Sequence, residues 1–115
     1  MLRRIESIFF NLEEDIKGNI MESIMIANRG SISFGYEQLG IQFLLNQSSL
    51  EEIMRDKIKK EVDCVWTKIE EDSLLPIKCK MIVDCENDTI MFNLTGTKYF
   101  FAIKKRLLQE YLKTK

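Results

Sequence analysis

Three acidic residues stand at alternate positions of the 115-residue chain: Asp84, Glu86 and Asp88. A calcium-binding loop of the EF-hand type begins with this spacing. The rest of that motif is missing, because Thr89 stands where the loop needs glycine and Thr95 where it needs a bidentate glutamate. We therefore interpret the cluster as a turn rich in Asp and Asn, and we expect neither a metal ion nor a cofactor.

Histidine is absent from the sequence, which removes a large part of enzyme chemistry. Without imidazole there is no Ser-His or Cys-His nucleophile pair and no zinc site that uses histidine. The three cysteines, Cys64, Cys79 and Cys85, are too few for a site of four thiolates and contain no C-x-x-C motif. On one strand Cys79 and Cys85 would lie about 20 Å apart, beyond disulfide reach. We expect a non-catalytic protein with free thiols in a reducing compartment.

The N-terminal segment has two arginines followed by apolar residues, as a signal peptide does. Glu6 and the acidic run at 13–15 interrupt the apolar stretch, and no small-residue cleavage site follows. No apolar run approaches the roughly 18 residues that a membrane-spanning helix needs. The sequence therefore predicts a cytoplasmic protein that does not enter a membrane.

Helical periodicity is the main pattern near the N-terminus. Apolar residues recur at steps of three and four over 2–24, which predicts a helix to about Lys17 or, slightly favoured, to about Ala27. A small hairpin is the alternative, because apolar residues alternate on both sides of a turn at Asn28-Arg29-Gly30. Both interpretations stay open at this point.

A short helix is expected over 36–44, and a long one over 50–71. Ser49 followed three residues later by Glu52 is a capping box, which predicts the start of the long helix. Its apolar residues from Leu50 onward follow a helical stripe, with opposite charges four residues apart on the other faces.

Strict alternation over 77–85, a polar turn at 86–88 and β-branched and aromatic residues over 89–94 predict an antiparallel hairpin. A terminal helix is expected over 98–112. The predicted fold class is α+β: one helix-dominated domain over residues 1–115, with the hairpin at about 77–94 packed on long helices.

An acidic patch follows from this arrangement. If the hairpin folds back along the long helix, its far end arrives near the helix start. The patch then contains Glu51, Glu52, Asp56, Asp84, Glu86 and Asp88. Six carboxylates in one place repel one another, and a basic partner relieves that repulsion.

The predicted function is that of a small bacterial binding protein that docks on a partner protein and neutralises it. The most concrete form is an immunity protein that inhibits a cognate toxin, such as a nuclease with a basic cleft, through the acidic patch. The alternative is a nucleic-acid-associated regulator that uses the basic C-terminal segment, although the sequence pI of about 5.6 makes nucleic acid an unlikely ligand. Its candidate residues are Lys98, Lys104, Lys105 and Arg106. A homodimer and a small ligand in the core stay open in either case.

Overall fold

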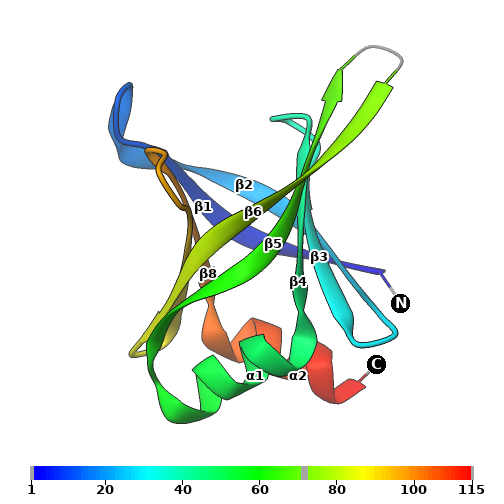
Figure 1. Cartoon of the computed structure of the whole chain (residues 1–115). Coiled ribbons are helices and arrows are strands. Elements are labelled where there is room, and N and C mark those ends of the chain that lie inside the picture. The colour runs from blue at the N-terminus through cyan, green and yellow to red at the C-terminus, as the bar shows by residue number, and fades with distance from the viewer. Residues whose placement is uncertain (1, 71–72, 115) are drawn as a thin grey trace.

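Eight antiparallel strands close into a barrel in the computed structural model, which describes residues 2–70 and 73–114 (Figure 1). The strands are neighbours in chain order, and the last pairs with the first, with Ser7 opposite Ile103. They are β1 (Leu2–Asn11), β2 (Asp15–Asn28), β3 (Ser31–Tyr36), β4 (Ile41–Asn46), β5 (Lys59–Glu70), β6 (Ser73–Glu86), β7 (Thr89–Leu94) and β8 (Tyr99–Lys104). Closure gives every strand a neighbour on both sides, which satisfies most of their backbone hydrogen bonds.

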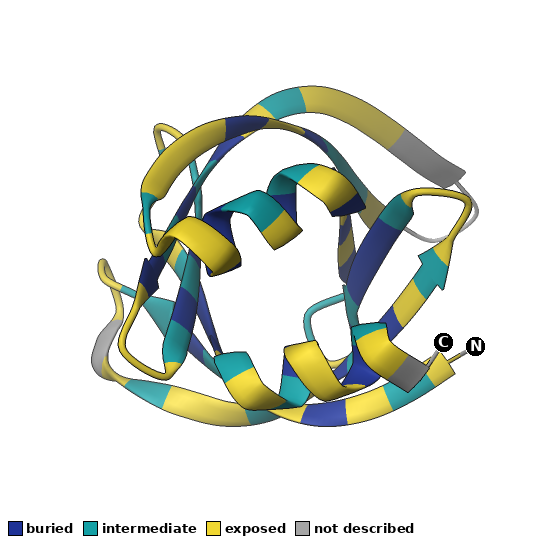
Figure 2. Ribbon diagram, turned by 90° about the horizontal axis from the view of Figure 1, so that it is seen from below, coloured by how far each residue is buried: buried dark blue, intermediate teal, exposed yellow. Residues whose placement is uncertain are grey.

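Two short helices lie at the same end of the barrel. Helix α1 (Gln47–Asp56) joins β4 to β5, and α2 (Lys105–Thr114) follows β8. Figure 2, seen from below, shows both helices lying across the barrel opening. Leu50 and Ile53 of α1 and Leu108 of α2 are buried, so their apolar faces cover this end of the core. The turns that join β1 to β2, β3 to β4 and β7 to β8 lie at the opposite end (Figure 1).

Aromatic rings fill much of the barrel interior. Phe43 lies at their centre, with the ring centroids of five other aromatic side chains between 5.2 and 6.2 Å away. These neighbours are Phe34, Tyr36, Trp66, Phe92 and Phe101. An interior of eight strands is just wide enough for such packing or for one small ligand.

The predicted helix-dominated α+β fold is wrong, and the N-terminal segment shows why. The expected helix from residue 2 is instead the β1–β2 hairpin, with Ile8 opposite Ile20. In β1 the side chains of Ile5 and Phe9 are buried, while Ile8 and Phe10 stand at the alternate positions. Because both faces of the strand carry apolar residues, their combined spacing imitates the steps of three and four of a helix.

The long helix expected over 50–71 is also wrong. Helix α1 ends at Asp56, because Lys57 adopts a left-handed backbone conformation with φ of 52°. Glycine usually takes this position, so the sequence contains no visible stop signal. The helix is capped by Asn46, whose side chain accepts a hydrogen bond from the Ser49 N–H, and not by the predicted Ser49. The next residues form β5, and residue 71 lies outside the described part of the chain.

Four further segments also differ from, or match, the elements expected from the sequence. The short helix expected over 36–44 is a turn followed by most of β4. The alternative hairpin does form, as β2 and β3, with Arg29 and Gly30 at positive φ in its turn. The hairpin predicted at 77–94 forms as β6 and β7, within the barrel instead of on long helices. The terminal helix begins only at Lys105, because the residues before it form β8.

Candidate functional site

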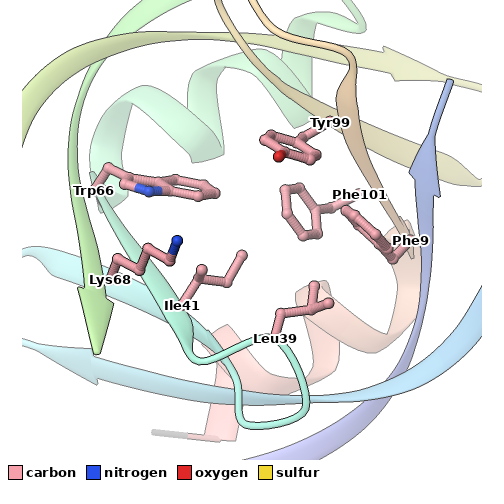
Figure 3. A pocket seen from close by; sticks show the side chains of 7 residues that line it. All are labelled: Phe9, Leu39, Ile41, Trp66, Lys68, Tyr99 and Phe101. Carbon is pink, nitrogen blue, oxygen red and sulfur yellow. The ribbon is translucent and has the colours of Figure 1, made fainter. Parts of the chain in front are cut away.

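A pocket lies at the end of the barrel opposite the helices (Figure 3). Its cavity volume is about 200 Å³, and its walls are formed by Phe9, Leu39, Ile41, Trp66, Lys68, Tyr99 and Phe101. An engineered apolar cavity of about 150 Å³ in another protein holds a benzene molecule. The pocket therefore has room for a single substituted ring.

Several strands supply the walls, and the pleat of each strand aims its side chain at the pocket. Phe9 of β1 lies opposite Phe101 of β8 in the sheet register, with 5.2 Å between their ring centroids. Trp66 of β5 lies opposite Phe43 of β4, and their rings are almost parallel at 6.2 Å. The core packing thus holds the pocket rings in place, which favours a largely preformed site.

Of the described residues that line the pocket, Lys68 is the one with a formal charge. In Figure 3 its amine points from the β5 wall toward the hollow, below the ring of Trp66. The residue is exposed, so the ammonium group lies near the rim, while Ile41 and Phe101 are buried. The site therefore offers an apolar interior with a cation close to its entrance.

A polar group is buried against the same aromatic rings. The Tyr36 hydroxyl forms a hydrogen bond of 2.7 Å with Ser7 Oγ, which donates to the Ala102 carbonyl oxygen. Burial raises the pKa of Tyr36 to about 12, and the hydroxyls of Ser7 and Ser23 offset this only in part. Ser23 Oγ does not reach hydrogen-bond geometry with any described group. The Tyr36 ring lies 4.7 Å from that of Phe101, behind the pocket wall.

The raised pKa of Tyr36 predicts a loss of stability in alkali. Its folded pKa of about 12 exceeds the ordinary value of 10, so its contribution is complete below pH 10 and is lost as the pH rises toward 12. Two pKa units correspond to about 3 kcal/mol. We expect the free energy of unfolding, measured by urea denaturation between pH 9 and about pH 12, to fall less steeply in Tyr36→Phe than in the wild type. Equal slopes would contradict a buried, neutral Tyr36.

The six acidic residues predicted to bind a partner lie at the helix end, away from this pocket (Figure 1). Three are on α1 and three are at or just after the end of β6. The two groups approach each other because Cys85 of β6 donates a backbone hydrogen bond of 3.1 Å to Ile58, which follows α1. Both groups thus lie at one end of the barrel. The expected arrangement, a hairpin folded back along a long helix, is not the one that brings them there.

Basic residues lie among these acids. Three ion pairs are present: Glu52 with Lys60 at 3.3 Å, Asp56 with Arg55 at 3.2 Å and Asp88 with Arg106 at 3.9 Å. The surface is therefore of mixed charge, and its role in partner binding stays a prediction.

The basic residues of the nucleic-acid alternative do not form one surface. Lys98 follows β7, at the pocket end of the barrel, whereas Lys104, Lys105 and Arg106 lie where β8 meets α2, at the helix end. This alternative also stays a prediction.

Sequence reasoning missed the pocket because it assigned Trp66 and the aromatic residues after Lys98 to the apolar faces of helices. The available signal was the alternation of Tyr99, Phe101 and Ile103, which is typical of a strand with one buried face.

Comparison of the chain with protein-family models, with curated proteins and with solved structures finds no match. Among the described residues, no three His, Cys, Asp or Glu side chains come together as a metal site requires. Neither α1 nor α2 has the length and apolar character needed to cross a membrane.

Proposed function

We propose that the protein binds a small aromatic molecule with an anionic group, such as an aromatic carboxylate, in the pocket at the open end of the barrel. The observation that carries this proposal is the lining: aromatic and aliphatic side chains with Lys68 near the rim. Aromatic walls stack on a flat ring, and a few polar groups fix its orientation.

The expected affinity follows from the size of the pocket. Burying about 150 Å² of ring surface contributes roughly 4 kcal/mol, and immobilising the ligand opposes binding, so the Kd should be about 1 mM or weaker. Lys68 is exposed, so water screens its attraction for an anion, and its contribution is about 0.2 to 1 kcal/mol. A carboxylate should therefore bind up to about five-fold more tightly than a neutral molecule of the same shape.

Trp66 provides the measurement, because it lines the pocket and is the single tryptophan of the chain. We expect its fluorescence to change saturably with benzoate, benzyl alcohol and benzylamine, three ligands with one ring and different charges. Benzoate should bind most tightly and benzylamine least. In Lys68→Met the preference for benzoate should disappear. In Lys78→Met, which removes an exposed lysine from the paired strand β6, the preference should remain.

Two results would contradict the proposal. Equal affinity for all three ligands in the wild type would show that binding does not depend on an anionic group of the ligand. No saturable change with any ligand in the millimolar range, together with no heat of binding by calorimetry, would rule out the pocket as a site for small aromatic molecules.

Neutralising a basic partner protein, such as a toxin, remains a separate proposal for the helix end, supported by the acidic residues that gather there. We also propose the cytoplasm as the compartment. The three free cysteines support this, because disulfides are rare in reducing compartments.

A further inference from the structure

Two of the three cysteines face each other across neighbouring strands. Cys64 of β5 lies directly opposite Cys79 of β6 in the sheet register. The Cys79 thiol donates a hydrogen bond of 3.7 Å to the Cys64 carbonyl oxygen. Opposed residues of an antiparallel pair have Cα atoms about 4.5 to 5.5 Å apart, within the range of disulfides. A bond between the two sulfur atoms therefore needs little movement of the backbone.

The third cysteine differs in its neighbours. Cys85 lies six residues further along β6, opposite Ile90 of β7, and is buried. The strand spacing places it about 20 Å from Cys79. It serves as an internal control for any chemistry of the other two.

The two cysteines differ in how far they are exposed. Cys64 is 3% exposed, whereas Cys79 is half-buried. The reason lies in the sheet: β7 pairs with β6 only from Met81 onward, and β5 and β6 continue past this point (Figure 1). Cys79 therefore lies just beyond the cover of β7.

We propose that Cys79 and Cys64 form a thiol-disulfide redox site whose oxidant is a small-molecule disulfide of the glutathione type. The Cys79 thiolate attacks one sulfur of the oxidant, forms a mixed disulfide and releases one thiol. The Cys64 thiolate then attacks the Cys79 sulfur, closes the Cys64–Cys79 bond and releases the second thiol. The protein loses two electrons and two protons, which convert one disulfide into two thiols.

The second step should be the slow one at neutral pH. Burial, and to a smaller extent the Cys79 thiol, raise the pKa of Cys64 to about 12. Little Cys64 thiolate then exists at pH 7. As long as the pH stays below the pKa, each increase of one pH unit raises the thiolate fraction about tenfold. The mixed disulfide on Cys79 should therefore accumulate early and resolve faster as the pH rises.

The test uses the full chain and glutathione disulfide, with intact mass and peptide mapping as readouts. Trypsin cleaves after Lys60, Lys68, Lys78 and Lys80, so the three cysteines fall in separate peptides. We expect the oxidised protein to lose two hydrogen atoms, to keep one free thiol and to yield peptide 61–68 joined to peptide 79–80. Cys85→Ala should give the same linked peptides, and Cys64→Ala should stop at a glutathione adduct on Cys79.

Several results would overturn the proposal. These are a stable glutathione adduct on Cys79 in the wild type at pH 9, a bond that includes Cys85, or no reaction of the folded protein under conditions where the unfolded protein reacts. If Cys64→Ala fails to fold, the wild type still decides: closure that is not faster at pH 9 than at pH 7 contradicts Cys64 as the second thiol.

Discussion

Phe43→Ala is expected to lower the free energy of unfolding by about 3 to 5 kcal/mol, as measured by urea denaturation. The Phe43 side chain is fully buried and contacts the aromatic cluster from several strands. Its removal takes apolar surface out of the core and leaves a cavity that rings held by neighbouring strands cannot easily fill. Because Phe43 also stacks on Trp66, the fluorescence emission of Trp66 in the folded variant should differ from that in the wild type.

Leu44→Ala is the matched control. Leu44 is the next residue of β4 and is 36% exposed, so its truncation should cost about 1 kcal/mol or less. The comparison also tests the architecture, because a strand places these neighbours on opposite faces, whereas a helix would place them about 100° apart. Equal losses for the two variants would contradict the barrel interior described for β4.

Tyr111→Ala is expected to cost about 4 to 6 kcal/mol, because it combines two losses. The Tyr111 ring is completely buried on the inner face of α2. Its hydroxyl accepts a hydrogen bond of 2.8 Å from the backbone N–H of Ala27 on β2. The side chain thus connects the C-terminal helix to the N-terminal half of the barrel, and its truncation should loosen the cover over this end.

Two variants separate the contributions at this helix. Tyr111→Phe keeps the ring and leaves the Ala27 N–H without the hydroxyl that accepts from it, so it should cost about 1 to 3 kcal/mol. Gln109→Ala alters an exposed position of the same helix and should change stability by less than about 0.5 kcal/mol. Limited proteolysis should show α2 released first in Tyr111→Ala. If Tyr111→Phe were as unstable as Tyr111→Ala, the ring would contribute nothing and the packing argument would fail.

The candidate pocket could not be predicted from sequence, for a geometric reason. Its lining residues are spread from Phe9 to Phe101, and they meet only because β1 pairs with β8 and so closes the sheet. No local pattern specifies that closure. The redox pair could not be predicted for a similar reason. Cys64 and Cys79 become neighbours only when β5 and β6 pair, whereas the sequence pattern predicted a helix around Cys64.

The sequence by itself determined the local features whose cause lies within a few residues. The hairpin of β6 and β7 was predicted, and the turn at Asn28-Arg29-Gly30 was recognised as the alternative to a helix, because turn chemistry and strict alternation are local signals. The lack of histidine likewise excluded imidazole chemistry at once.

Only the tertiary structure decided that 2–28 and 59–70 are strands. Their residues have apolar side chains on both faces, so the same sequence pattern is compatible with helix and with strand periodicity. Pairing with strands that are distant in sequence selects the strand. In a closed barrel most backbone groups of the strands find their partners on a neighbouring strand, and those partners cannot be recognised from any single segment of the sequence.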